Sequence, residues 1–457
     1  QSLKSNLLQH HHSVDIINAC LERHTTLYET LSTVAENEFD LIGFTGPQDV
    51  FAEVYWLANK IREKGFTKHI TLGHDFATLN HELLLKKYKD FDSVIRGEGE
   101  HTIVKLASSL EKSSDLKAID GLTFRLESTG EIISNKSRLP IQNLDDLPWV
   151  DRDDLGKVKR LHFSPSIYTK RGCPYQCSFC TTGMVAIREG IRGSNVWRKR
   201  SASKVVDEME ILSKNYKVKY LSIVDDLYLA KGKDGAEHAL TIAEEMISRN
   251  LSIQYMIDCR IDSIDLNHFE LLKKSGLNKV FVGVESGSEN TLKYFRKGYN
   301  PKLIKEKLNI LDSLSIEYLL GFIIFNPYET IEGLLQSLDL LKQLSVRDFE
   351  LFLQSVRIYS GTQLHFALYN YNLIKGQFPF FKAIYVDQDV AQIKDLMKKI
   401  SENSIKILKS KNSKEIYFRD AMYTIVLNAL TDMINSVKIG ADLNKVYDNL
   451  MLEINRI

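Results

Sequence analysis

The stretch TKRGCPYQCSFC, residues Thr169 to Cys180, decides how the chain is interpreted, because it holds three of its five cysteines. Cys173, Cys177 and Cys180 are separated by three and then two residues, so their thiolates can converge on one site from a single loop. Four thiolates would close a zinc or iron–sulfur site, whereas three leave one position open for chemistry. The alternative is a structural zinc loop that a distant histidine completes.

Composition limits the kind of protein that carries this loop. The 457 residues are 44% hydrophobic and 26% charged, which predicts two or three domains with sizeable cores. A net charge of +1 gives no reason to expect nucleic acid or an anionic membrane as partner. The odd cysteine count, with Cys20 and Cys259 standing alone, argues for a reduced compartment. No apolar run reaches about 18 residues and no secretory signal opens the chain, so we expect a cytoplasmic protein without a membrane span.

Strand-like and helix-like segments alternate on both sides of the cysteine loop. We predict a first α/β domain over residues 1–140, with glycine-ended strands near 40–46, 69–75 and 91–100 and a hairpin turning at Thr129 and Gly130. Residues 141–159 are predicted to be a linker. Six strand–helix units over 160–386 predict a parallel sheet curled into a full or partial barrel. Residues 387–457 have helical periodicity and are expected to pack on the barrel or cover its mouth.

The spacing of the three cysteines, with the aromatic Phe179 before the last one, resembles the radical S-adenosylmethionine (SAM) enzymes. In that family the cysteines hold three irons of a 4Fe-4S cluster, and the fourth iron binds the amino and carboxylate groups of SAM. One electron then cleaves the sulfonium to a 5'-deoxyadenosyl radical. The resemblance explains the count of three, since a fourth thiolate would occupy the position that SAM needs. It also implies that Phe179 contributes to the cofactor site.

Three strand ends resemble motifs of the same family. GVESGSENTLKYFRKG (283–298) is similar to the fourth-strand motif, which implies that Glu285 and Ser286 face SAM. MIDCRIDSI (256–264) is similar to the third strand, where Arg260 could pair with the methionine carboxylate. VDDLYLA (224–230) is similar to an acidic turn that gives Asp225 and Asp226. Taken alone, each of these polar residues would be an ordinary strand-end group in water, but the order and spacing of the three motifs favour the resemblance.

Two turns depart from the family pattern. FNPYET (325–330) stands where the family has Pro-Gly-Glu-Thr, and Ser360-Gly361-Thr362 stands where it has Pro-Gly-Thr. Both departures lie near the expected barrel mouth, so they affect the substrate side rather than radical initiation. Tyr228, Tyr328 and Tyr359 lie near predicted strand ends, where an aromatic ring either contacts substrate or packs in the core.

The first domain is similar to the cobalamin-binding domain that precedes one branch of the family. The segments that carry the likeness are DLIGFTG, ITLGHDFAT and VIRGEGEHTIVKL, and the resemblance as a whole spans about residues 35–365. Glycine-rich turns at the ends of parallel strands let the backbone approach a large flat cofactor closely. The residues implied to line the corrin are Thr45, Gly46, Pro47, Gln48, Gly73, His74, Gly97, Glu98, Gly99 and Glu100. No Asp-x-His-x-x-Gly motif supplies a histidine to cobalt, and His74 at a strand end is either a ligand or a hydrogen-bonding residue.

The resemblance therefore implies a Rossmann-like cobalamin-binding domain, a partial (β/α)6 barrel and a helical C-terminal region. We expect a cobalamin-dependent methyltransferase acting at an unactivated carbon of a small molecule, with an external flavodoxin or ferredoxin as electron donor. One SAM would methylate cob(I)alamin, and a second would be cleaved so that the substrate radical takes the methyl group. The alternatives are a non-methylating rearrangement, cyclisation or carbon–carbon coupling, with or without cobalamin, and a non-catalytic metal-binding protein.

Overall fold

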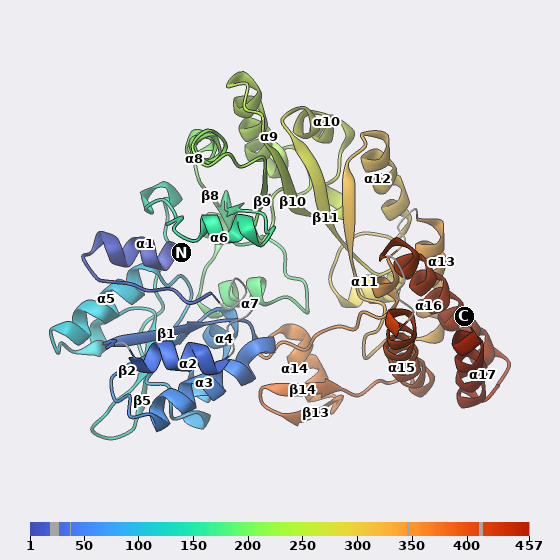
Figure 1. Cartoon of the computed structure of the whole chain (residues 1–457), viewed down its shortest axis with the longest axis horizontal. Helices are drawn as coiled ribbons and strands as arrows, with labels where there is room; N and C mark the ends of the chain where they lie inside the picture. Colours follow the sequence, from blue (N-terminus) through green and yellow to red (C-terminus); the bar gives the residue numbers. More distant parts are fainter. Residues whose placement is uncertain (19–26, 37, 345–347, 411–414, 457) are drawn as a thin grey trace.

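Figure 1 shows the computed structural model of the chain, which describes residues 1–18, 27–36, 38–344, 348–410 and 415–456. A sheet near the N-terminus (blue) is followed by a second sheet in the middle of the chain (green to gold). Long helices of the C-terminal region (red) lie beside the second sheet. This order confirms the predicted α/β fold with a helical end. The lone Cys20 of the sequence analysis falls outside the described residues.

The first sheet has the strand order β1-β2-β3-β4-β5. Its first three strands run parallel, and the hairpin β4–β5 extends the sheet antiparallel. Adjacent residues of a strand face opposite sides, so Val94 packs with the helices α3 and α4 while Ile95 packs with α5. The bounds are β1 Leu41–Thr45, β2 His69–Gly73, β3 Ser93–Ile95, β4 Leu122–Arg125, β5 Ile132–Ser134, α1 Ser2–Gln9, α2 Leu27–Glu36, α3 Phe51–Glu63, α4 Asp75–Lys87 and α5 Glu100–Glu111.

The second sheet is parallel, with the order β12-β11-β10-β9-β6. In β10 and β11 buried residues alternate with half-buried or exposed ones, as expected where helices cover one face of a sheet. The strands are β6 Ser166–Ile167, β9 Tyr220–Ile223, β10 Gln254–Arg260, β11 Leu277–Glu285 and β12 Glu317–Phe322. The helices are α8 Ala202–Lys214, α9 Lys233–Ser248, α10 Leu266–Lys274, α11 Glu289–Tyr294, α12 Lys302–Ser313 and α13 Ile331–Gln343.

The predicted sixth barrel strand is almost absent, which corrects the expectation of six full units. In the described part of segment 349–359, a short 3-10 helix (Phe349–Phe352) is followed by a single parallel bridge between Phe325 and Ser355. Phe325 donates its N–H to the Gln354 carbonyl and accepts from the Val356 N–H. The segment therefore occupies the sixth position of the barrel but pairs over too few residues to form a strand.

Short elements surround the cysteine loop and connect it to the rest of the chain. An antiparallel pair, β7 (Lys170–Arg171) and β8 (Arg198–Lys199), lies before and after it, and α6 (Leu155–Arg160) and α7 (Thr181–Arg188) flank it. The C-terminal elements are α14 Gln363–Asn370, β13 Ile374–Gln377, β14 Phe380–Ala383, α15 Gln388–Ser410, α16 Glu415–Lys438 and α17 Leu443–Arg456. The last three helices share one apolar core with the second sheet and its helices.

The hairpin β13–β14 reaches back to the first domain. The Phe378 ring at its tip stacks on Phe76 with the ring centroids 5.9 Å apart. The Phe378 carbonyl accepts hydrogen bonds from Lys87 Nζ at 2.7 Å and Tyr88 Oη at 3.3 Å. The hairpin therefore joins α4 of the first domain, and Figure 1 shows it between the first sheet and the C-terminal helices.

We find no helix with the length and apolarity needed to cross a membrane in the part of the chain that the structure describes.

Candidate active site

The cysteine loop lies between β7 and α7, and Asp226 holds both of its ends. Asp226 Oδ2 accepts the Gly172 N–H at 3.0 Å, and its Oδ1 accepts the Thr182 hydroxyl at 3.1 Å. Gly172 has a φ of +85°, and a Cβ at that position would lie 2.0 Å from the Val196 carbonyl oxygen. Only glycine fits there, so the backbone conformation before Cys173 is fixed by the fold.

The three cysteines of the loop are free and partly exposed. Burial, together with the neighbouring cysteines and Asp226, raises the pKa of the Cys173 thiol to about 12. Burial also raises the pKa of Cys180. Without a positive metal centre, the Cys173 and Cys180 thiols would therefore stay protonated at neutral pH.

These thiols fit a 4Fe-4S cluster better than a single ion. Among the described residues, no three histidine, cysteine or carboxylate side chains converge on a position for one metal ion. In a 4Fe-4S cube the cysteines bind different irons, so they need not meet at one point. Cys173 also lines a large cavity, which leaves room for a further ligand beside the loop.

Phe179 anchors the loop to the barrel. Its ring packs edge-on against Phe295, with centroids 5.0 Å apart. Next to it, the Ser178 hydroxyl donates to the Tyr294 carbonyl at 3.0 Å, and the Ser178 carbonyl accepts the Leu364 N–H at 2.7 Å. The loop is therefore joined to α11 on one side and to α14 on the other.

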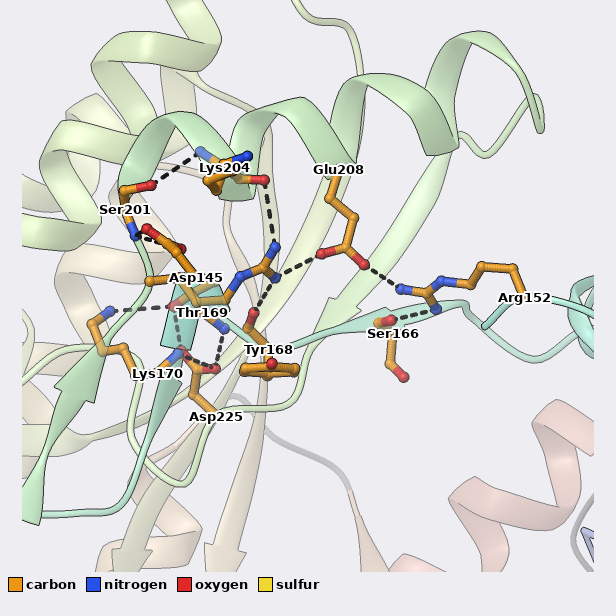
Figure 2. Close-up of polar contacts among 11 residues, drawn as sticks. Asp145, Arg152, Ser166, Tyr168, Thr169, Lys170, Ser201, Lys204, Glu208 and Asp225 are labelled. Atoms are coloured by element: carbon orange, nitrogen blue, oxygen red, sulfur yellow. Dashed lines mark hydrogen bonds and ion pairs between the residues drawn. The ribbon is translucent and has the colours of Figure 1, made fainter. Parts of the chain in front are cut away.

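The two acidic residues after β9 have different positions, and Figure 2 shows the contacts of the first, Asp225. Asp225 is 4% exposed and accepts the backbone N–H groups of Thr169 at 2.6 Å and Lys170 at 3.0 Å. Lys170 Nζ in turn donates to the Tyr228 carbonyl at 2.5 Å and lies 4.3 Å from the centre of the Tyr228 ring. Asp225 thus supports the strand that leads into the loop, while Asp226, the other residue of the predicted acidic turn, holds the loop itself.

The ends of β10 and β11 bring further charges toward the loop. Glu285 has a φ of +67° and accepts from Lys297 Nζ at 2.9 Å. Ser286 is fully buried, with its hydroxyl 3.1 Å from that of Ser337 on α13. The Nη1 atom of Arg260 lies 3.8 Å from Cys177 Sγ. Of the expected SAM contacts, Arg260 is therefore beside the cysteine loop, and Ser286 faces α13.

A cavity of about 1440 Å³ separates the first sheet from the cysteine loop. The predicted corrin contacts that line it are Thr45, Gly73, His74, Gly97, Glu98, Gly99 and Glu100. On the opposite side its lining includes Arg171, Cys173, Thr182, Arg198 and Asp226. His74 is exposed and has a φ of +89°, a backbone conformation that is costly for any residue other than glycine.

Three of the predicted corrin contacts lie elsewhere. The described lining of the cavity does not include Gly46, Pro47 or Gln48. The Gln48 side chain is 8% exposed and donates to the carbonyls of Ile358 at 3.0 Å and Pro379 at 2.8 Å. It also accepts the Ser360 N–H at 2.7 Å. Gln48 therefore joins the first domain to the segment around the hairpin β13–β14.

Glu98 and Glu100 form ion pairs with the barrel across the edge of the cavity. Arg171 lies 2.6 Å from Glu100 and 3.4 Å from Glu98, and Arg198 lies 2.8 Å from Glu98. Although burial opposes it, the Arg171 guanidinium holds the pKa of Glu100 below its usual value. We call these four residues the interdomain ion-pair cluster. Sequence reasoning missed it, although Arg171 in TKRGC was a signal of a charged partner.

The three candidate tyrosines differ in position. Tyr228 is fully buried beneath Lys170, and Tyr328 packs on Tyr294 with ring centroids 4.3 Å apart. The Tyr359 hydroxyl donates to Asp49 at 3.1 Å. All three rings thus have packing or hydrogen-bonding partners within the protein.

Comparison with known proteins places these features in a family. Residues 167–341 match the model of the radical SAM superfamily. An uncharacterised methyltransferase of Pyrococcus horikoshii is 27% identical over 364 residues, which are 79% of this chain and 76% of that protein. The anaerobic magnesium-protoporphyrin IX monomethyl ester cyclase of Synechocystis sp. is 29% identical over 278 residues, and these cover 59% of this chain but only 52% of the cyclase.

The fold also matches a solved structure over nearly the whole chain. The cobalamin-dependent SAM radical enzyme OxsB, with aqua-cobalamin and SAM bound, superimposes with a TM-score of 0.75. The match covers 96% of this chain and 69% of OxsB at 18% sequence identity. At that identity the likeness concerns the fold, including the first domain that precedes the matched superfamily region.

Proposed function

The chain belongs to the radical SAM superfamily, and on that premise we propose that it is a cobalamin-dependent methyltransferase acting at an unactivated carbon of a small molecule. Its superfamily cofactors are a 4Fe-4S cluster on Cys173, Cys177 and Cys180 and SAM. We further propose that an external flavodoxin or ferredoxin supplies electrons in the cytoplasm.

The observation that carries the proposal is a cavity lined by both the first domain and the cysteine loop. Ligand pockets for drug-sized molecules hold about 300–1,000 Å³, and this cavity has about 1440 Å³. The glycine-rich ends of β2 and β3 lie on one side and Cys173 lies on the other. A corrin held by the strand ends and a cluster held by the cysteine loop would share this cavity, and radical methyl transfer needs such proximity of the reacting groups.

The residues of the chain have separable roles in this proposal. When bound, the cluster supplies the electron that cleaves SAM, and cobalamin supplies the methyl group. Gly73 and Gly97 allow a flat ring to approach the strand ends, because they carry no side chain there. Asp226 fixes the loop that bears the cysteines through Gly172 and Thr182. Phe179 and Ser178 hold the same loop against α11 and α14.

A second function, a non-methylating radical reaction, is favoured by one of the relatives. The Synechocystis protein is named a cyclase, and it aligns with more than half of this chain. The two functions differ in product mass, because methylation adds a methyl group and a cyclisation or rearrangement does not. In both, the cysteine loop would act in the same way.

The test is an anaerobic reconstitution of the cluster, with hydroxocobalamin, SAM and a reductant added and products followed by mass spectrometry. We expect 5'-deoxyadenosine together with retained, methylated cobalamin. Replacing Cys177 by Ala should abolish 5'-deoxyadenosine, whereas Cys259→Ala, at a buried cysteine outside the loop, should not. Formation of 5'-deoxyadenosine without retained cobalamin would reject the methyltransferase and leave the non-methylating reaction. A colourless protein with bound zinc would reject the radical chemistry as well.

A further inference from the structure

Arg260 is a buried cation held in one orientation beside the cysteine loop. It ends β10 and is 5% exposed. Its guanidinium carbon lies 3.9 Å from the ring centre of Tyr175, a residue of the cysteine loop, and 5.5 Å from that of Tyr299. An arginine that packs against aromatic rings is restricted in position and only weakly hydrated. Its charge therefore acts on the loop from a fixed place.

The hydrogen bonds of Arg260 use most of its donors. Nε and Nη2 donate to the two oxygens of Asp262 at 2.9 and 3.0 Å. Nη2 also donates to the Lys297 carbonyl, and Nη1 donates to Cys177 Sγ at 3.8 Å. An arginine has five N–H donors, so only one hydrogen, on Nη1, remains. The resemblance implied that Arg260 could pair with the methionine carboxylate, and a two-point pair would require Arg260 to give up some of these partners.

We propose that Arg260 is a positioning residue that raises the reduction potential of the cluster through its hydrogen bond to Cys177. Reduction adds one electron to the cluster and its cysteine sulfurs, with no bond formed or broken in the protein. A cation and an N–H donor beside a ligand sulfur stabilise the added negative charge, and hydrogen bonds to the sulfurs are a known determinant of cluster potentials. Asp262, 9% exposed, opposes this effect by offsetting part of the charge.

The proposal makes Arg260 and Asp262 act in opposite directions. Removing the arginine should make the cluster harder to reduce, because it deletes the cation and leaves the Asp262 carboxylate near the loop. Replacing Asp262 by Asn should make the cluster easier to reduce, because the arginine keeps its charge and loses its counter-ion. A purely structural role would not give shifts of opposite sign.

The experiment is a redox titration of the reconstituted full-length protein with dithionite, followed by electron paramagnetic resonance of the reduced cluster. SAM is omitted, so a contact to its carboxylate cannot contribute. We compare the parent protein with Arg260→Gln, Arg260→Lys and Asp262→Asn. Arg249→Gln is the matched control, because Arg249 also forms ion pairs but lies at the end of α9, with Asp207, Glu210 and Glu245 as partners.

We expect the midpoint to move to more negative potential in Arg260→Gln and to more positive potential in Asp262→Asn. Arg260→Lys should lie between the parent and Arg260→Gln, because lysine keeps the charge but cannot bind Asp262 and Cys177 together. The iron and sulfide contents of each variant are measured first, to show that it holds a cluster. If Arg260→Gln holds none, the midpoints of Asp262→Asn and Arg260→Lys test the proposal. Unchanged midpoints in the variants that hold a cluster, or shifts of the same sign in the Arg260 and Asp262 variants, would overturn the proposal.

Discussion

Replacing Arg171 by Ala should destabilise the protein strongly, because it leaves Glu100 of the interdomain ion-pair cluster as an unpaired buried charge. Glu100 is 4% exposed, and its contact to Arg171 is 2.6 Å. The Ser2 hydroxyl at 2.8 Å would be its remaining side-chain partner among the described residues. Removing one member of a buried ion pair costs about 3–5 kcal/mol. Glu98 is less affected, since it keeps Arg198 at 2.8 Å.

Two further measurements separate this reasoning from a general packing defect. In the double variant Arg171→Met and Glu100→Met, apolar side chains replace both charges, so the loss should fall to about 1 kcal/mol or less. In Arg171→Ala the buried carboxylate should have a raised pKa, so it becomes protonated and uncharged as the pH falls. The deficit of the single variant should therefore be present at pH 7 and shrink near pH 4.

The assay is anaerobic guanidinium unfolding of the cluster-free protein, followed by circular dichroism at both pH values. A loss below about 1 kcal/mol in Arg171→Ala would refute the buried-charge argument. A double variant that is as unstable as Arg171→Ala would also refute the argument. Either result would mean that water or another cation compensates Glu100 in solution.

Three other predictions concern the barrel side of the molecule. Glu208→Ala leaves the buried Arg200 and the half-buried Arg152 without their shared carboxylate; Figure 2 shows Glu208 beside Arg152. The variant should lower the free energy of unfolding by about 3–5 kcal/mol, measured by chemical denaturation. Burial lowers the pKa of Lys170 to about 8, so the unfolded state binds more protons than the folded state between pH 8 and 10.5. The free energy of unfolding of the parent should therefore rise by about 3 kcal/mol over that range relative to Lys170→Met. If the unfolding free energies of the two proteins ran parallel with pH, this prediction would be contradicted. Gly172→Ala should abolish iron binding, because its Cβ would lie 2.0 Å from the Val196 carbonyl oxygen. The control Gly190→Ala should retain iron, because Gly190 also has a positive φ, of +70°, but has open space around it. Equal iron contents in the two variants would disprove the steric argument.

The parts of the fold that the sequence predicts are those encoded by local patterns. The cysteine loop, the strand β11 and the alternation of apolar strands with amphipathic helices each depend on residues close together in the chain. The prediction of a sixth strand was wrong, because a local pattern does not show whether a segment finds a strand to pair with. Its apolar run is compatible with a strand, but strand formation also needs a neighbour, and only one residue pair meets at Phe325 and Ser355.

The partners of the site residues could not be predicted, because they are distant in sequence. Glu98 and Glu100 were predicted from glycine-rich turns to line a corrin, and they do line the cavity, but their carboxylates bind arginines of β7 and β8. Gln48 binds backbone groups more than 300 residues further along the chain. A turn motif specifies the backbone that it needs, but it does not specify which distant side chains will meet it.

The hairpin β13–β14 and the interdomain ion-pair cluster attach the first domain to the rest of the protein at separate places. A further contact lies on α7, where the Thr181 hydroxyl donates to Asp75 at 2.9 Å. Each added attachment removes directions in which one rigid body can move relative to another. The spacing between the cysteine loop and the strand ends is therefore set by the folded protein, and a cofactor that enters the cavity would meet walls whose separation is already defined.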